Sequence, residues 1–399
     1  MSETIAPTDE AGIAAAVAAA HASGEPLAVE GNGTKRALLR PVQAARTLST
    51  RNLTGISLYK PQELVLSARA GTPMPEIEAA LAEKGQMLIA EPPDTRAIFG
   101  ASLPATFGGI VATNLSGPRR IAWGAMRDHV LGIRAVNGTG EVFRSGGRVL
   151  KNVTGLDLCK LLTGAHGTLG VLTEITVKVL PAPEATGTVA VRVPDLATGV
   201  AALAAGLGSP FGVSGAALVP EGAPREAILD GTIAVLRLEE FSESLTYRLG
   251  RLREDLARFG DISTLEGENS RALWRQIREA APLAADPAEA IWRVSVRPSA
   301  GPAVAQAVAA AFGGRVLLDW GGGLVWIAGP ATAAAHAAVM DASAAAGGVF
   351  CLFRAPEPLR AAVAVLPEEA APLAAIARRV KAVMDPRGVL NPGRMRAGV

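Results

Sequence analysis

The sequence is poor in side chains that bind metals or form disulfides. Its 399 residues include only two cysteines, Cys159 and Cys351, and four histidines, none of which lies within five residues of another. Two thiols cannot hold an iron–sulfur cluster or a four-cysteine zinc site within one chain. They cannot form a disulfide framework either, so we expect a reducing, cytoplasmic location and no metal site.

Excess charge and long apolar helices are also lacking. The chain has 39 basic and 37 acidic residues, which argues against a nucleic-acid-binding protein. Residues 1–10 contain three acids and no Lys or Arg, the opposite of a secretory signal. Two uncharged stretches, 196–220 and 320–340, reach membrane-spanning length. Glycine and proline interrupt both, so they predict strand–turn–helix segments instead.

Apolar residues and glycine, by contrast, are abundant. An apolar share of 49% predicts a large core in two or three domains, and 44 glycines predict many loops. No internal repeat is evident in the sequence. The second half predicts a compact α+β arrangement, with strands near 187–193, 232–238, 290–296, 315–319 and 323–328 and helices near 195–207, 242–258, 268–280, 300–312 and 331–346.

A glycine-rich loop follows the first strongly apolar predicted strand. Leu27 to Glu30 is a short apolar run, and Gly31-Asn32-Gly33-Thr34-Lys35 comes directly after it. Glycines allow backbone N–H groups to converge on an anion. The string lacks the Lys-Ser/Thr pair of a P-loop and the third glycine of a dinucleotide fingerprint. Taken alone, it fits an ordinary tight turn as well as a phosphate-binding loop.

A second glycine pair opens a short predicted helix. Gly108-Gly109 is followed by an apolar turn that ends in Thr113-Asn114-Leu115-Ser116-Gly117. A helix start attracts a pyrophosphate, because its free N–H groups and its dipole both favour negative charge. Close packing of two backbones is the alternative reason for such a pair.

A third glycine-spaced string leads into a predicted strand. It runs from Gly164 to Glu174 and contains Gly170-Val171-Leu172-Thr173. His166 lies inside the turn. A catalytic base is one interpretation of this histidine, and a structural residue, the more frequent role in tight loops, is the other.

Together and in this order, the three strings resemble the FAD-binding domain of the vanillyl-alcohol oxidase / p-cresol methylhydroxylase (PCMH) superfamily. There, a glycine loop after a strand wraps the diphosphate, and the other two strings line the cofactor. Residues 385–394, Asp-Pro-Arg-Gly-Val-Leu-Asn-Pro-Gly-Arg, resemble the C-terminal element of the same superfamily, which packs back on the flavin domain.

Further strings make the resemblance closer. They are Pro118-Arg119-Arg120, Arg127-Asp128-x-Val-Leu-Gly132, Lys151-Asn152-Val-x-Gly155-x-Asp157 and Asp319-Trp320-Gly321-Gly322. With them, nearly the whole chain looks like the family of FAD-binding subunits of bacterial glycolate oxidases, the GlcE type.

The resemblance implies an α+β fold in three parts. A PCMH-type FAD-binding domain of two subdomains would span 1–182, a smaller α+β cap domain 183–353, and a segment returning to the flavin domain 354–399. The string Pro181-Ala182-Pro183 agrees with the first boundary, because two prolines cannot continue a regular ladder or helix.

The cofactor implied by the resemblance is noncovalent FAD. The first glycine loop holds no His or Cys for a covalent bond. Arg119 and Arg120 either neutralise phosphate, line a partner surface or form a solvated pair. The residues expected to bind FAD are Gly31, Asn32, Gly33, Thr34, Gly108, Gly109, Thr113, Asn114, Ser116, Gly117, Gly170, Val171, Leu172 and Thr173.

The residues that would act on a substrate are less evident. Oxidation of a 2-hydroxy acid needs a cation for the carboxylate and a base for the hydroxyl proton, while the flavin supplies the redox chemistry. Related catalytic flavoproteins carry a C-terminal histidine-rich metal motif that this sequence lacks. Arg293, Arg354 and Arg394, together with Arg297, remain as candidate carboxylate clamps, although structural roles are the more frequent ones for such arginines.

We therefore expect a subunit that depends on partners. The resemblance implies a complex with a larger FAD subunit, which oxidises glycolate to glyoxylate, and an iron–sulfur subunit that passes electrons on, peripheral to the inner membrane and without a transmembrane segment. Three alternatives stay open: a self-sufficient FAD-dependent 2-hydroxy-acid dehydrogenase, a scaffold that has lost its flavin, and a UDP-sugar enolpyruvyl reductase of the same superfamily.

Overall fold

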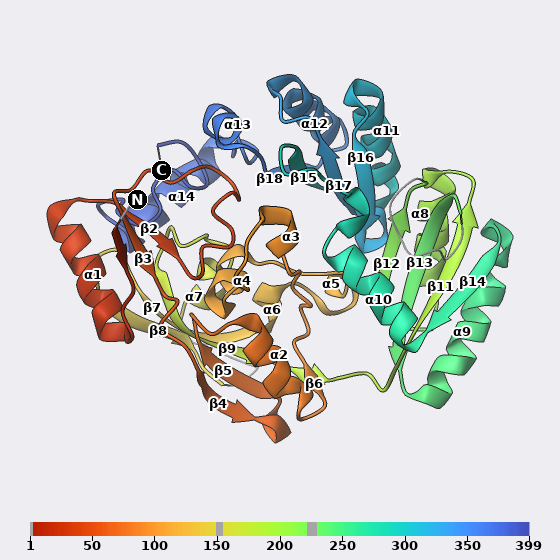
Figure 1. The fold of residues 1–399 in the computed structure, drawn as a ribbon, viewed down its shortest axis with the longest axis horizontal. Helices are drawn as coiled ribbons and strands as arrows, with labels where there is room; N and C mark the ends of the chain where they lie inside the picture. Colours follow the sequence, from red (N-terminus) through yellow and green to blue (C-terminus); the bar gives the residue numbers. More distant parts are fainter. Residues whose placement is uncertain (1–2, 149–154, 222–229, 399) are drawn as a thin grey trace.

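The structure is a computed structural model that describes residues 3–148, 155–221 and 230–398. Figure 1 shows two bodies, one formed by the red-to-yellow part of the chain and one by the green-to-teal part, with the blue C-terminal segment returning toward the first. Lys151-Asn152, part of one string noted in the sequence, lies outside the described residues.

A five-stranded antiparallel sheet forms the base of the first body. Its strands, in spatial order, are β4 (Ile56–Lys60), β5 (Val65–Arg69), β9 (Val171–Lys178), β7 (Val130–Val136) and β8 (Val142–Gly146). The helices of this body are α1 (Glu10–Ser23), α2 (Met74–Ala82), α3 (Arg96–Phe99), α4 (Phe107–Thr113), α5 (Arg120–Trp123), α6 (Met126–His129) and α7 (Leu158–Leu162). α4 packs on β5 and β9 through the fully buried Phe107 and Ile110, which fixes its place above the sheet centre.

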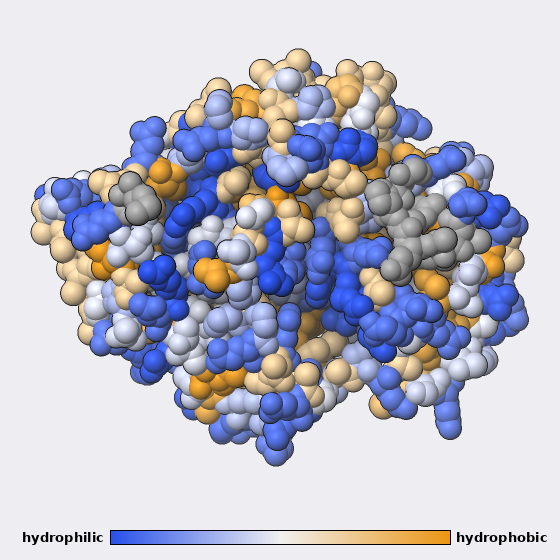
Figure 2. Space-filling view, viewed as in Figure 1, coloured by the Kyte–Doolittle hydropathy of each residue, from blue (hydrophilic) through white to orange (hydrophobic). Residues whose placement is uncertain are grey.

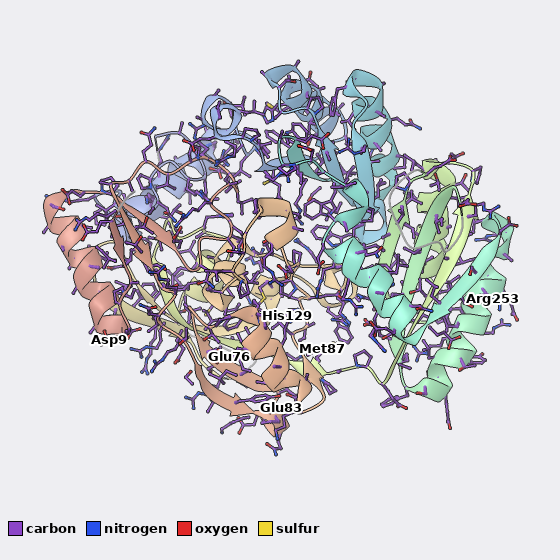
Figure 3. All side chains as sticks on the ribbon, viewed as in Figure 1. Asp9, Glu76, Glu83, Met87, His129 and Arg253 are labelled. Atoms are coloured by element: carbon purple, nitrogen blue, oxygen red, sulfur yellow. The ribbon has the colours of Figure 1, made fainter. Side chains whose placement is uncertain are left out.

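A small parallel sheet stands beside the large one. It orders β1 (Glu3–Ile5), β3 (Arg46–Ser49) and β2 (Leu27–Glu30), and a two-stranded ladder joins β6 (Gln86–Met87) to β10 (Leu180–Pro181). α1 begins after Asp9, labelled in Figure 3, whose carboxylate accepts a hydrogen bond from Gly12 N at 2.7 Å. Ile13 and Val17 of α1 then pack against β2, so this helix holds the strand from which the first glycine loop emerges.

An eight-stranded antiparallel sheet forms the second body. In spatial order its strands are β14 (Ile262–Glu266), β11 (Ala185–Val193), β13 (Thr232–Glu240), β12 (Val213–Val219), β16 (Arg315–Asp319), β17 (Leu324–Gly329), β15 (Ala290–Ser295) and β18 (Val349–Arg354). Its helices are α8 (Leu196–Leu207), α9 (Ser242–Leu256), α10 (Gly267–Arg278), α11 (Gly301–Phe312) and α12 (Ala333–Ala345). The strands and helices expected from the sequence in this part are confirmed, whereas β12, β14 and β18 have no counterpart among those expectations.

The second body contains a structural repeat. Along the chain, β11–α8–β12–β13–α9–β14 is followed by β15–α11–β16–β17–α12–β18, and the four strands of each unit have the same spatial order. The strands of the two units pair at one register position, Leu218 on β12 and Leu318 on β16, and α8 also packs against α11. The sequence does not display this repeat, because only the pattern of elements, not their residues, is repeated.

The C-terminal segment packs back on the first body, as the resemblance implies. It contains α13 (Glu357–Ala362) and α14 (Ala371–Met384). Leu27 N donates a hydrogen bond to Val389 O at 2.8 Å, and Asn391 N donates one to Leu27 O at 3.1 Å. One hydrophobic core runs from Leu38 to Val365, so the domain boundaries at 182 and 353 stay predictions. In the part of the chain that the structure describes, no helix is long and apolar enough to cross a membrane.

Candidate functional site

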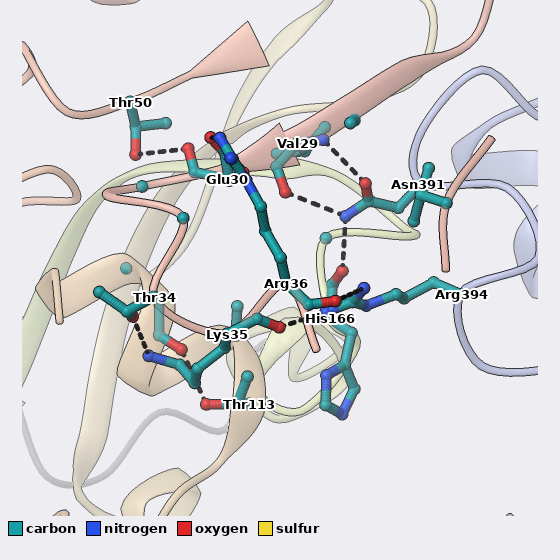
Figure 4. A pocket seen from close by; sticks show the side chains of 18 of the residues that line it. Val29, Glu30, Thr34, Lys35, Arg36, Thr50, Thr113, His166, Asn391 and Arg394 are labelled. Carbon is teal, nitrogen blue, oxygen red and sulfur yellow. Dashed lines mark hydrogen bonds and ion pairs between the residues drawn. The ribbon is translucent and has the colours of Figure 1, made fainter. Parts of the chain in front are cut away.

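A cavity of about 460 Å³ lies where the small sheet, α4, the loop before β9 and the C-terminal segment meet. Its size is that of a small-molecule site. Figure 4 shows the labelled side chains that surround it, among them Lys35, His166 and Arg394, which come from three distant parts of the sequence. All of the lining comes from residues 28–172 and 357–394, and no described residue of the second body contributes.

The loop after β2 presents free backbone amides to this cavity. Among the described residues, none accepts a hydrogen bond from the backbone N–H groups of 31–35. Gly31 has no room for a side chain, since a Cβ would lie 2.1 Å from Thr106 Oγ1, and Gly33 has φ +68°. Asn32 Nδ2 donates to Pro104 O at 2.9 Å and holds the loop from outside. Convergent free amides of this kind suit an anion.

Lys35 adds a buried positive charge to the same loop. The residue is 8% exposed, and its Nζ donates to Thr34 Oγ1 at 3.2 Å. No carboxylate in the described ranges forms an ion pair with it. Burial lowers the pKa of Lys35 to about 8, although the charge of Asp94 acts in the opposite direction. The ammonium group therefore lacks the anion that normally accompanies a buried cation.

Two arginines from the C-terminal segment support this loop. Arg394 donates to Lys35 O at 2.6 Å and to Arg40 O at 3.1 Å, and the buried Arg360 donates to Leu39 O at 3.0 Å. Burial lowers the pKa of Arg394 to about 10, with repulsion from Arg360 acting in the same direction. Both arginines hold the backbone, and their charges add to the positive character of this end of the cavity.

The helix start at Gly108-Gly109 does not offer the free N–H groups that the sequence predicts. Phe107 N donates to Thr72 O and Gly108 N to Ala70 O, and Gly109 N donates to the capping Thr106 Oγ1 at 3.3 Å. The first-turn amides are therefore already used within the protein. The two glycines instead permit close approach: a Cβ on Gly108 would lie 2.7 Å from Ala70 Cβ, and one on Gly109 would lie 3.6 Å from Lys35 Nζ.

His166 also lines the cavity. It has φ +53°, and its buried Nδ1 has no hydrogen-bond partner within the described residues. Burial lowers the pKa of His166 to about 3, and the nearby charges of Arg394 and Lys35 act in the same direction. The imidazole is thus neutral and a weak base at physiological pH, which favours a structural role over that of a catalytic base.

Asn391 joins the two sides of the cavity. Its Oδ1 accepts a hydrogen bond from Val29 N at 2.7 Å, while its Nδ2 donates to His166 O at 2.9 Å and to Val29 O at 3.2 Å. A single side chain from the C-terminal segment therefore sets the spacing between β2 and the loop before β9.

Of the fourteen residues expected to bind FAD and the four arginine candidates, eleven line this cavity and seven do not. Asn114 Oδ1 accepts from Arg127 N, and Ser116 Oγ accepts from Met126 N, so both organise a turn beyond α4. Thr173 Oγ1 donates to Glu10 on the far side of β9. The lining residues are Gly31, Asn32, Gly33, Thr34, Gly108, Gly109, Thr113, Gly170, Val171, Leu172 and Arg394, and the others are Asn114, Ser116, Gly117, Thr173, Arg293, Arg297 and Arg354.

The three remaining arginine candidates, Arg293, Arg354 and Arg297, do not line the cavity. Arg354 donates to Ile98 O at 2.8 Å and to Glu289 O at 3.0 Å, so its hydrogen bonds hold backbone. Arg293 lies over the rings of Trp326 and Trp320, 4.7 and 5.5 Å from their centres. Burial lowers the pKa of Arg293 to about 10.

A second cavity of about 320 Å³ lies between the two bodies, where Figure 2 shows hydrophilic residues along the seam. Arg237, 2% exposed, forms ion pairs with Glu91 at 2.8 Å and Glu239 at 3.4 Å. Arg119 pairs with Glu239 at 2.6 Å. Burial raises the pKa of Glu239, but the two arginines outweigh it and bring the value to about 2. This network fastens the bodies together and explains Arg119 as a structural residue.

Sequence reasoning did not select Lys35, Arg360 and Asn391 as binding residues. Lys35 is the last residue of the first glycine string, but only the residues before it, Gly31 to Thr34, were expected to bind FAD. Arg360 and Asn391 reach the site only because the C-terminal segment folds back, a tertiary effect that has no local pattern.

Comparison with known proteins agrees with this geometry. The FAD binding domain family matches residues 2–146. Glycolate oxidase subunit GlcE of Escherichia coli (strain K12) is 37% identical over 374 residues, 93% of each chain. Glycolate oxidase subunit GlcD of Bacillus subtilis (strain 168) is 31% identical over 144 residues, 36% of this chain and 29% of that protein.

The fold comparison agrees as well. A crystal structure of p-cresol methylhydroxylase with substrate bound superposes with a TM-score of 0.77 at 14% identity, covering 99% of this chain and 88% of the other. The PCMH-type α+β fold is thereby confirmed. Free amides, an unpaired ammonium and room for a ligand together fit an anionic dinucleotide, and the chain belongs to the family of glycolate oxidase subunit GlcE, FAD-linked oxidoreductases whose cofactor is FAD.

Proposed function

We propose that this chain is the FAD-binding subunit of a glycolate oxidase complex and that it holds FAD noncovalently in the 460 Å³ cavity. The observation that carries this proposal is the pairing of free amides at 31–35 with the unneutralised Lys35 ammonium. A diphosphate would accept hydrogen bonds from both. The lining includes no cysteine and no tyrosine, and His166 is buried and neutral, so the described residues offer no evident anchor for a covalent flavin.

The role within the complex is electron transfer between this flavin and a partner. Oxidation of glycolate to glyoxylate releases two electrons and two protons, which the larger FAD subunit would collect and an iron–sulfur subunit would carry on. The cavity lining supports this role, because the second body, where a substrate-binding cap is expected, contributes none of its described residues. The two cysteines of this chain cannot hold a cluster of the usual four-cysteine kind.

A self-sufficient 2-hydroxy-acid dehydrogenase is the second candidate, and Arg293 favours it. Its Nε is buried without a partner, and no described residue accepts a hydrogen bond from it or forms an ion pair with it. Such a cation is available to a carboxylate. Against this stands its distance in the fold from the cavity, whose lining does not include it.

One purified chain distinguishes these functions. We expect a yellow protein whose FAD is released on denaturation in acid, and which turns over glycolate with an artificial acceptor only when the partner subunits are added. Robust turnover by the chain alone, lost in Arg293→Met, would establish the self-sufficient enzyme. A colourless protein that takes up no FAD would support the scaffold instead, and activity with NADPH would support the reductase.

A further inference from the structure

α14 exposes a row of aliphatic side chains. Leu373, Ile376 and Val383 are 60%, 55% and 75% exposed, and Val380 between them is half-buried. We call these four residues the α14 ridge. Their spacing of three, four and three residues places them on one side of the helix. A surface helix normally turns its apolar stripe toward the core, yet no residue of α14 is fully buried.

The helix is nevertheless firmly attached. Lys381 Nζ donates to Thr168 O at 2.7 Å and to Leu390 O at 3.1 Å, and pairs with the buried Asp385 at 2.7 Å. Gly138 N donates to Met384 O at 2.8 Å. These contacts fix α14 on the first body, so the outward direction of the ridge does not result from a loose helix.

We propose that the α14 ridge is the docking face for a partner subunit of the complex, whose contact surface is an apolar groove rimmed with carboxylates. This proposal rests on the proposed function as a subunit. Arg379, which lies beside the ridge on the surface of the helix, is exposed and forms no ion pair within the described part of the chain. An acidic rim would supply the charge that this arginine lacks, and aliphatic side chains at the centre with arginine beside them are typical of a contact surface.

Charge disfavours a second copy of this chain as the occupant. α14 contains two exposed arginines and Lys381 but no acidic residue. In an antiparallel pair of α14 helices joined through their ridges, Arg379 near the middle of one helix would face Arg379 of the other. Like charges in this position cost binding energy, whereas a carboxylate rim gains it.

The position of the ridge suits electron exchange. Thr168, which accepts from Lys381, belongs to the loop whose residues His166, Gly167 and Gly170 line the cavity. A partner on the ridge is thus separated from the cavity wall by little more than α14, a helix about 10 Å across. In Figure 1, α14 lies on the side of the first body away from the second, so the second body does not obstruct it.

The test is co-expression of this chain, tagged, with the GlcD-type and iron–sulfur subunits of the same organism. Wild-type chain is expected to recover partner subunits. Ile376→Glu with Val383→Glu should reduce their recovery about tenfold or more, the effect of removing the centre of an interface, with unchanged FAD content and melting temperature. The matched control is Phe241→Glu with Tyr247→Glu, since these side chains are 73% and 66% exposed on the second body; its recovery should equal wild type.

Each result decides between the proposals. Full recovery with the ridge variant, or equal loss with the control variant, overturns docking at α14. A wild-type chain that recovers no partner overturns the proposed function and this inference with it. Charge reversal at the ridge, Arg379→Glu, should also reduce recovery; an increase would overturn the acidic rim. A dimer of the isolated chain that the ridge variant abolishes would show a second copy to be the occupant.

Discussion

Replacing Lys35 by methionine isolates the charge of the proposed diphosphate site, because methionine keeps an unbranched side chain as far as Cε and lacks the ammonium group. A hydrogen bond to a charged group contributes about 1.5–3 kcal/mol. At 1.36 kcal/mol for each factor of ten, we expect FAD to bind about 10- to 150-fold more weakly. The five free amides of 31–35 remain, so binding should weaken but persist.

The pH dependence follows from the same group. The pKa of Lys35 is about 8 without ligand, and a bound diphosphate would raise it. The contribution to affinity is therefore fully present below pH 8 and is lost as the pH rises through the pKa of the complex. The affinity of the wild type should fall between pH 8 and pH 10, and that of Lys35→Met should not.

The assay is titration of flavin-free protein, followed by quenching of flavin fluorescence. Riboflavin, which has no phosphate, should bind both proteins equally, and Lys84→Met, at an exposed lysine, should behave as wild type. Burying the uncompensated ammonium opposes folding at neutral pH by on the order of 3 kcal/mol. Flavin-free Lys35→Met should therefore have a higher melting temperature than the flavin-free wild type. An FAD affinity equal to wild type in Lys35→Met would refute the assignment of this cavity to the diphosphate.

Three further predictions concern the walls of the site and the seam. Gly109→Asp would place a carboxylate beside Lys35 Nζ, 3.6 Å from the new Cβ, so bound FAD should fall sharply while the second body stays folded; unchanged flavin stoichiometry would contradict this. Asn391→Ala leaves the Val29 N–H group without its acceptor and should lower the free energy of unfolding, measured with urea, by about 1–3 kcal/mol. Glu239→Gln removes a negatively charged partner of Arg119 and Arg237 and should lower the free energy of unfolding by about 3 kcal/mol at pH 7. Because the folded pKa of Glu239 is lowered to about 2, the stability it contributes is present above the unfolded value of 4.5 and is lost as the pH falls toward 2, so the two proteins should converge in acid melts.

The glycine loop after β2 could be predicted from the sequence because the glycines that shape it lie within the loop itself. Gly31 and Gly33 are needed for close approach to Thr106 and for a positive φ, and both needs are visible as glycines in the chain. Gly117 shows the limit of this reasoning. It too has no room for a side chain, but the atom it would meet is Glu91 O, at 2.1 Å, so the glycine serves packing and not the cavity.

The start of α4 shows a second limit. A glycine pair at a helix start predicts free amides, yet Thr72 O and Ala70 O from the neighbouring turn accept the hydrogen bonds of Phe107 and Gly108. Whether an amide is free depends on which carbonyl tertiary packing brings to it. For the same reason the repeat of the second body cannot be predicted from the sequence, because β12 and β18 are recognisable only once their partners in the sheet are known.

Contacts from the second body keep one wall of the cavity rigid. Arg237 and Arg119 join Glu239 of the second body to Glu91 of the first, and Trp320 Nε1 donates to Gly117 O at 3.1 Å. These contacts hold the turn that follows α4, and α4 in turn forms a wall of the cavity. A body that closes over a substrate needs weak, reversible contacts with its partner body, whereas buried charge pairs are costly to break. The seam is therefore better suited to keep a flavin in a fixed position, which an electron-transferring subunit requires, than to open and close around a substrate.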